Sequence, residues 1–515
     1  MSKSRIDTVA AIDLGTNSIR MMIAQITPSG EILQLEDVWH PTHIGKDTFA
    51  YGRIQVETIH DTCDILKGFS KLMHDYRVKH YRAVCTSGMR EAENREYVLE
   101  QIRVRTGLVI EVINNAQERF LMYKAIRGYL PDTQWISEKG TLIADVRSGG
   151  VEISVYSEGH LKFTEYIKVG SLRLRELLSD LEPMTLDFPS IMEEFVESRI
   201  DFLKHLLRGM HVNIFIGLGG ELRTIARLCT VDDFEAEDKY IKRKALVKLY
   251  SKVRTMTTEQ VAKEFALQRN QAEILLPSII LFYSFIEMAG VEGIYAPMVS
   301  LMHGLLADMA DERLDTPRKK SSLNDVISSV WFIGQKYSID QVHCAHIEKL
   351  ALAIFDQTSS IHRLGERERF YLRVACILHD IGKYVNLNQH DIHSYNIIRF
   401  QDIMGFSNRE LNLVANIARY HSDEIPHQSH ENYLVLNKKD QITVSKLAVI
   451  LRMVEALDIS HKQKISNIDI DISSKEIIFK IRSSEDTLLE EWSFASNSTF
   501  FEEVMGIKPV IKRKK

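Results

Sequence analysis

Three apolar runs in the first half of the chain each end in a polar or glycine-rich turn. The first reaches Asp13, turns through residues 14–18 and is followed by a second apolar run at 19–23. The next, Thr141–Asp145, turns at 146–150 and returns with alternating apolar and polar residues at 151–155. The third, Ile214–Leu218, leads through two glycines into a helix-period pattern. Because alternation is typical of strands and a 3.6-residue period of helices, the pattern predicts two strand hairpins and a strand–turn–helix.

Each predicted hairpin places a carboxylate, Asp13 or Asp145, at the end of its first strand. In the first turn, Gly15 lets the backbone bend close to a ligand, and the next three residues offer hydroxyl, amide and main-chain donors. A phosphate there would meet several N–H groups, with Asp13 placed to hold a metal ion or its water. Two such hairpins suit a cleft between two similar halves, as in actin-like and sugar-kinase-like proteins. For the first turn taken alone, the alternative is an ordinary polar hairpin.

The later pattern changes from mixed to almost wholly helical. Pro131 marks a break between the two halves of the first part, and the polar stretch 311–322 is predicted to be a linker. Helical periodicity continues from Leu323 to about Asp458, and strand alternation returns at 468–472 and 476–481, before a predicted helix at 488–504. We therefore expect an α/β fold with a duplicated actin-like domain (1–133 and 134–312), an all-α domain (321–462) and a small αβ appendage (463–515).

Net charge, cysteine spacing and the longest apolar stretch indicate which kinds of partner and location to expect. The net charge of −5 over 515 residues gives no argument for nucleic-acid binding. Five scattered cysteines without CxxC spacing, and a start without a signal-peptide region, predict a reducing, cytoplasmic location. The longest apolar stretch, Ile274–Ala289, contains a proline and a glutamate and is predicted to be a buried helix, so no membrane partner is expected.

Two further segments of the first part carry candidate chemistry. Residues 111–121 run from a strand into a helix, which puts Glu118 in the first helical turn. A carboxylate there can orient and deprotonate a water for attack on phosphorus, or it can simply be a glutamate favoured by the helix dipole. Arg90, after the strand 81–85, can clamp a phosphate or pair with Glu91 or Glu93 on the surface.

The helical half carries a cluster of histidines and acids. His379 and Asp380 close an amphipathic helix, and both can reach one divalent cation. Other candidate ligands lie far away in sequence: His343, His390, His393, His421, Glu455 and Asp458. Mixed nitrogen and oxygen ligands suit Mn²⁺, Fe²⁺ or Zn²⁺ better than Mg²⁺. The alternative is a buried polar network that binds no metal.

Together these segments resemble the exopolyphosphatase/guanosine pentaphosphate phosphohydrolase (Ppx/GppA) family over nearly the whole chain. Residues 13–18 are similar to its DLGSNS hairpin, 86–94 to its T…R.A.N segment, and 145–152 to its DIGGGSTE hairpin. The helical half resembles the HD-like domain of the longer members, with LHDIGK at 378–383 and ARYH at 418–421. The resemblance implies that Arg90 contacts phosphate, that Glu118 is the catalytic base, and that Asp145 and Glu152 serve catalysis and bind Mg²⁺ or Mn²⁺. The phosphate-binding residues would be Asp13, Gly15, Thr16, Asn17, Ser18, Arg90, Arg147, Ser148, Gly149, Gly217, Gly219 and Gly220.

The resemblance implies an exopolyphosphatase that releases orthophosphate from the end of inorganic polyphosphate, as a homodimer. The alternatives are hydrolysis of guanosine pentaphosphate, a catalytically weak protein that binds polyphosphate or a nucleotide, and an activity in the HD half alone. In that half, a second divalent metal would be held by His343, His379, Asp380 and an acid, Glu455 or Asp458.

The chain departs from the family pattern mainly in the phosphate cradle. Arg147 and Ser148 stand where the family has glycines, and Glu221 stands where a small hydroxyl residue usually follows the glycine turn. Gln117 replaces the first of two glutamates, and Met298 and Met302 replace an aspartate and an arginine. Arg147 can hinder the approach of backbone to phosphate or bind the phosphate itself.

Overall fold

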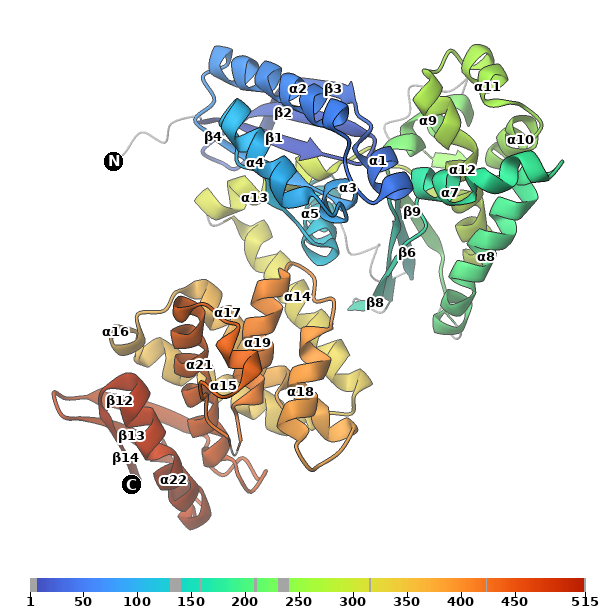
Figure 1. The fold of residues 1–515 in the computed structure, drawn as a ribbon. Helices are drawn as coiled ribbons and strands as arrows, with labels where there is room; N and C mark the ends of the chain where they lie inside the picture. The colour runs from blue at the N-terminus through green and yellow to red at the C-terminus, as the bar shows by residue number, and fades with distance from the viewer. Residues whose placement is uncertain are drawn as a thin grey trace. The chain divides into compact units, whose positions relative to one another are not determined.

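The N-terminal unit of the protein, up to Asp325, is built on two mixed β-sheets, as the sequence pattern predicts. The computed structural model describes residues 7–129, 140–157, 160–207, 211–229, 240–314, 316–422 and 424–513. The predicted boundary at 133/134 lies outside these residues. Figure 1 shows the N-terminal unit in blue to yellow and the second unit in gold to red.

The first sheet has the strand order β3-β2-β1-β4-β5. Its central strand β1 pairs antiparallel with β2, which places Asp13 opposite Arg20, and parallel with β4. This confirms the first predicted hairpin, and apolar residues such as Ile12 and Leu14 are fully buried in the core below it. The strands are β1 (Asp7–Leu14), β2 (Ser18–Ile26), β3 (Ile32–Pro41), β4 (His80–Cys85) and β5 (Glu111–Val112).

Helices surround this sheet, and α2 packs on β2 and on α4 (Figure 1). Glu118 lies in the first turn of α5, as the sequence predicts. The helices of this half are α1 (Ile44–Tyr51), α2 (Val56–Asp75), α3 (Ser87–Arg90), α4 (Arg95–Thr106) and α5 (Asn115–Tyr129).

The second sheet has the order β10-β11-β9-β6-β7-β8. The antiparallel pair β6–β7 sets Asp145 opposite Glu152, and β6 runs parallel to β9. The second hairpin and the strand before the glycine turn are therefore confirmed. The strands are β6 (Thr141–Val146), β7 (Val151–Ser157), β8 (His160–Ile167), β9 (Ile214–Leu218), β10 (Tyr240–Lys242) and β11 (Gly293–Tyr295).

The central helix of the second half is α12 (Arg269–Ala289), which packs against α7, α8 and α9. It is long and apolar enough to cross a membrane, but 61% of its most apolar stretch is buried inside the unit, in agreement with the predicted buried helix. The neighbouring helices are α7 (Ser171–Leu178), η1 (Ser179–Met184), α8 (Phe188–Leu206), α9 (Gly220–Cys229), α10 (Arg243–Val253), α11 (Thr258–Glu264) and α13 (Leu301–Leu314).

The predicted linker at 311–322 is largely helical, because α13 ends at Leu314 and α14 starts at Pro317, where proline suits a first helical position. The second unit begins at Val326, within α14. Its helices are α14 (Pro317–Lys336), α15 (Gln341–Gln357), α16 (Ser359–His362), α17 (Glu366–Leu378), η2 (Ile381–Tyr384), α18 (His390–Arg399), α19 (Asn408–Arg419), α20 (Glu431–Leu434) and α21 (Lys438–Leu457).

The chain ends in a three-stranded sheet covered by one helix, which packs on α21. The predicted strands and helix are present, and the sequence reasoning missed a third strand, which runs parallel to β13. These elements are β12 (Asn467–Ile472), β13 (Glu476–Arg482), α22 (Leu488–Met505) and β14 (Lys508–Arg513).

Candidate active site

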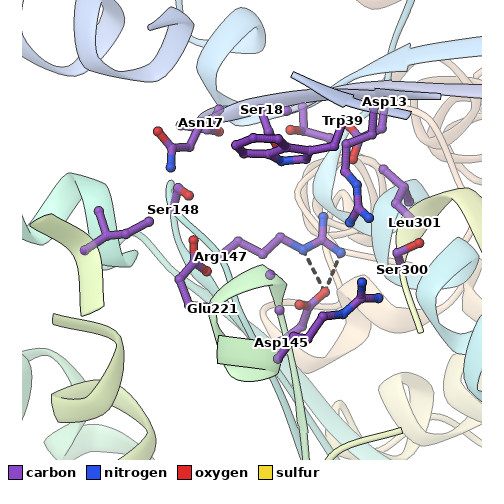
Figure 2. A pocket seen from close by; sticks show the side chains of 18 of the residues that line it. Asp13, Asn17, Ser18, Trp39, Asp145, Arg147, Ser148, Glu221, Ser300 and Leu301 are labelled. Atoms are coloured by element: carbon purple, nitrogen blue, oxygen red, sulfur yellow. Dashed lines mark hydrogen bonds and ion pairs between the residues drawn. The ribbon is translucent and has the colours of Figure 1, made fainter. Parts of the chain in front are cut away.

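A cavity of about 490 Å³ opens where the ends of both sheets meet within the N-terminal unit. It is lined by the β1–β2 turn, the β6–β7 turn, the start of α9 and the segment 298–301 (Figure 2). The structure thus brings together most of the site residues that the sequence predicts: Asp13, Gly15, Thr16, Asn17, Ser18, Glu118, Asp145, Arg147, Ser148, Gly219 and Gly220.

The β1–β2 turn is held in place on both sides. The Gly15 amide donates to the Ser18 carbonyl over 2.9 Å, and a Cβ on Gly15 would lie only 2.8 Å from that oxygen. The hydroxyls of Thr16 and Ser87 are 3.0 Å apart, which ties the turn to the start of α3. Glycine is therefore required at position 15, and Asn17 and Ser18 face the cavity from a fixed backbone (Figure 2).

Arg147 is the central feature of the cavity. Figure 2 shows its side chain crossing the pocket toward Asp145. Its Nε donates to the Asp145 carboxylate over 2.7 Å, and its Nη1 forms an ion pair with Glu118. One guanidinium therefore joins two of the three carboxylates that the sequence predicts to be catalytic.

Several buried acids surround the Arg147 guanidinium. Burial, followed by repulsion from Glu152, Glu221 and Asp13, raises the pKa of Asp145 well above its ordinary value. Burial also raises the pKa of Asp13 to about 6 and that of Glu221 to about 7. Oδ1 of Asp13 is buried and has no hydrogen-bond partner among the described residues. The lining therefore carries more acids (Asp13, Asp37, Glu118, Asp145 and Glu221) than arginines (Arg20, Arg147 and Arg223).

Arg90 lies against the start of α5. It does not line the cavity; its Nη1 donates to the Ile113 carbonyl over 2.6 Å and lies 3.5 Å from Oε2 of Glu118. It also donates to the side chain of Asn115, at the start of α5. In this conformation Arg90 fixes the helix start that carries Glu118.

Three other predicted site residues also lie outside the cavity lining. Glu152 forms an ion pair with Arg119, which is 4% exposed. A Cβ on Gly149 would lie 2.1 Å from Oγ of Ser87, so this glycine permits close packing between the two turns. A Cβ on Gly217 would lie 2.6 Å from Ile294, so this glycine serves the core.

The sequence reasoning missed further residues of the lining, among them Arg20, Trp39 and Arg223. Arg20 could have been found, because the hairpin register places it opposite Asp13. Arg223 lies near the start of α9, in the helix that follows the predicted glycine turn. Trp39 comes from β3, which no motif marks.

The predicted metal cluster of the helical unit is also assembled. His343, His379, Asp380 and Glu455 offer ligand atoms that all lie within 4.8 Å of one another. Nε2 of His343 and of His379 are each 3.3 Å from Oε2 of Glu455. Asp458 lies behind them, where its carboxylate accepts from Nδ1 of His343 over 2.8 Å. Of the two predicted acids, Glu455 is therefore the one that faces the cluster, and Asp458 orients a histidine.

In each candidate metal site a basic side chain already contacts one of the carboxylates. In the helical unit, the facing nitrogens of His343 and His379 are buried against Oε2 of Glu455, and Lys383 donates to Oδ2 of Asp380. In the cleft, Asp145 supplies the carboxylate oxygens that Mg²⁺ prefers, but the Arg147 guanidinium lies on them. A cation can bind Asp145 and Glu118 together only when Arg147 has moved away.

Family models and curated relatives both relate this chain to Ppx/GppA phosphatases. The profile of the Ppx/GppA phosphatase family matches residues 22–313, and that of Ppx/GppA phosphatase domain III matches 327–498. A guanosine-5'-triphosphate,3'-diphosphate pyrophosphatase from Vibrio vulnificus is 21% identical over 450 residues, which cover 86% of each chain. Exopolyphosphatase 2 from Mycobacterium tuberculosis is 24% identical over 318 residues, which cover 59% of this chain and 98% of its own.

Solved structures share the fold of the N-terminal unit. A Ppx/GppA family member from Aquifex aeolicus, 25% identical, matches with a TM-score of 0.50 over 60% of this chain and 99% of its own. An exopolyphosphatase from Cytophaga hutchinsonii, 20% identical, matches with a TM-score of 0.54 over 59% of this chain and 98% of its own. The unit therefore has the predicted actin-like fold. Since the family profile alone spans more than half of the chain, this protein belongs to the Ppx/GppA phosphatase family.

Proposed function

We propose that the cleft hydrolyses the terminal phosphoanhydride of inorganic polyphosphate and releases orthophosphate. The observation that carries the proposal is the meeting of the fixed Gly15–Ser18 turn, Glu118 and Arg147 in one cavity. Arg20 and Arg223 add two more cations to its wall. A polyanion with repeating charges matches several separated arginines, each able to bind phosphate oxygens bidentately.

In the proposed reaction the residues act mainly by position and charge. The β1–β2 turn binds the terminal phosphoryl group, and Arg147 turns from Asp145 toward the phosphate oxygens. This frees Glu118 to orient a water and accept its proton, with Arg90 holding the helix start in place. Mg²⁺, or Mn²⁺, bound at Asp145 would neutralise charge on the phosphate. A metal role for Glu152 requires its ion pair with Arg119 to open.

One observation favours a second substrate, guanosine pentaphosphate. Trp39 lines the same cavity, and its flat ring offers a surface on which a guanine base can stack (Figure 2). The pyrophosphatase relatives named for this kind of substrate also match 86% of the chain, including its second unit. Replacement of Trp39 by leucine should then weaken hydrolysis of guanosine pentaphosphate and leave polyphosphate hydrolysis unchanged.

The test of the function is orthophosphate release from each purified substrate by the wild type and by Glu118→Gln. The amide keeps the size of the carboxylate but accepts no proton, so the rate should fall at least ~10²-fold while binding is retained. Glu96→Gln is the matched control, since Glu96 lies in the first turn of α4 with its side chain 75% exposed. Near-normal turnover by Glu118→Gln would remove this residue from the mechanism. Tight binding without release by the wild type would favour a regulatory protein.

We further propose that the helical unit is HD-like and binds one divalent cation through His343, His379, Asp380 and Glu455. The proposal is supported by the ligand atoms of these four residues, which all lie within 4.8 Å of one another. The homodimer and the cytoplasmic location stay predictions, which light scattering of the purified chain and cell fractionation would test.

A further inference from the structure

A serine and a histidine contact each other at the edge of the cleft, where the segment 298–301 runs into α13. Ser300 directly precedes the helix and is one of the residues that line the cavity (Figure 2). Its Oγ lies 2.8 Å from Nδ1 of His303, which lies in the first turn of α13. A hydroxyl beside a histidine nitrogen is the pairing that activates a serine for attack. The cavity wall therefore carries a candidate nucleophile together with a candidate base.

The hydrogen bonds of His303 decide which atom of the pair carries the proton. The backbone amide of Ser300 donates to Nδ1 of His303 over 3.1 Å. Because an amide N–H only donates, Nδ1 presents a lone pair and holds no hydrogen. The Ser300 hydroxyl must then also donate to Nδ1. Its proton therefore already points at the nitrogen that would remove it.

The alternative role for this pair is to cap the start of α13. In a helix cap, the serine or threonine oxygen accepts from the backbone amide three residues later. Thr257 does this at the start of α11, where its Oγ1 accepts from the Gln260 amide over 3.3 Å. At the start of α13, the His303 amide donates to the Ser300 carbonyl over 3.0 Å, and the Ser300 hydroxyl contacts the histidine ring. This hydroxyl is therefore used differently from a capping hydroxyl.

The surroundings of His303 keep its ring neutral and can bring a phosphate close to it. Burial lowers the pKa of His303. Asp37 opposes this shift, whereas the guanidinium groups of Arg20 and Arg223 add to it. A ring that is neutral at pH 7 is able to accept a proton. Because both arginines also line the cavity, a phosphate group that they bind would lie near Ser300.

We propose that the cleft also transfers a phosphoryl group from polyphosphate to its own Ser300, with His303 as the general base. This rests on the proposed function, because the donor is the substrate expected there, and it adds a second activity. Oγ of Ser300 forms a bond to the terminal phosphorus, the anhydride P–O bond breaks, and its electron pair leaves on the shortened polyphosphate. Nδ1 of His303 takes the hydroxyl proton. The product is a phosphoserine on the wall of the cavity.

Mass spectrometry of the full-length protein tests the transfer. The chain is incubated with polyphosphate and Mg²⁺ and digested, and the peptide that contains Ser300 should carry one added phosphoryl group. Ser300→Ala should lose this modification. His303→Asn should slow it at least ~10²-fold, because the amide oxygen still accepts hydrogen bonds but takes up no proton. Thr257→Ala removes a capping hydroxyl outside the cavity lining and, as the matched control, should be modified at the rate of the wild type.

Orthophosphate release, measured in parallel, separates the transfer from the proposed function. The phosphoserine is sought in the wild type and in Glu118→Gln, where attack by water on either phosphate is slowed and the modification should still form. Orthophosphate release without phosphoserine in either chain would overturn the transfer alone, and the absence of both would overturn both proposals. Full-rate modification of His303→Asn would overturn the role of the base, and a phosphoryl group on another residue would overturn the assignment to Ser300. Thermal melting identifies any variant that fails to fold.

Discussion

Replacement of Arg147 by alanine should remove the guanidinium from Asp145 and Glu118 and allow a divalent cation to bind these carboxylates more tightly. In the wild type the guanidinium contacts Asp145 and Glu118, so a divalent cation must displace it to bind both carboxylates. Hydrogen bonds between charged groups contribute about 1.5–3 kcal/mol each, and the Arg147 side chain is 26% exposed, which weakens them. If Mg²⁺ no longer has to displace about one such hydrogen bond, its affinity should rise about 10- to 100-fold.

The same change should weaken the binding of substrate, because Arg147 is also the cation that we expect to turn toward the phosphate. Isothermal titration with Mg²⁺ and with polyphosphate, each without the other, measures the two affinities separately. Arg175→Ala is the control, since Arg175 is a partly buried, ion-paired arginine of the same unit outside the cavity lining. An unchanged Mg²⁺ affinity in Arg147→Ala would refute the competition. Tighter polyphosphate binding would show that Arg147 obstructs the cleft.

Three further predictions follow from single contacts. Burial raises the pKa of Glu221 to about 7, so the carboxylate becomes charged as the pH rises through that value and then repels a polyanion. Glu221→Thr should therefore lower the KM for polyphosphate about 3- to 10-fold at pH ~8 and flatten the pH dependence of this KM. Gly15→Ala should lower activity about tenfold, because the new Cβ would lie 2.8 Å from the Ser18 carbonyl, whereas Gly68→Ala, in open space on α2, should not. Although burial opposes it, the bond from Arg367 holds the pKa of Glu410 at about 2. This depressed pKa adds about 2–3 kcal/mol of stability above the unfolded pKa, which is lost as the pH falls toward 2, and urea unfolding of wild type and Glu410→Gln at pH ~3 and ~7 measures it.

The sequence determined the parts of this protein that depend on neighbouring residues. The apolar runs placed Asp13 and Asp145 at the ends of strands, and the polar turn marked Gly15 as the point where the backbone bends. The helix start at 115 put Glu118 in a first turn, and the amphipathic pattern of α17 put His379 at its end. Backbone periodicity and local sterics decide these features, so a single sequence is sufficient to predict them.

The tertiary structure decided how the charged side chains are paired. The sequence left Arg90 either to clamp a phosphate or to pair with a neighbouring glutamate, and in the structure it contacts the Ile113 carbonyl. Arg119 pairs with Glu152. No spacing in the sequence indicates that Arg147 spans Asp145 and Glu118, or that Asp380 faces histidines on both sides. Long flexible side chains choose among several partners that folding brings within reach, and burial sets the strength of each pair. The chemistry of both sites therefore depends on contacts between residues that are far apart along the chain.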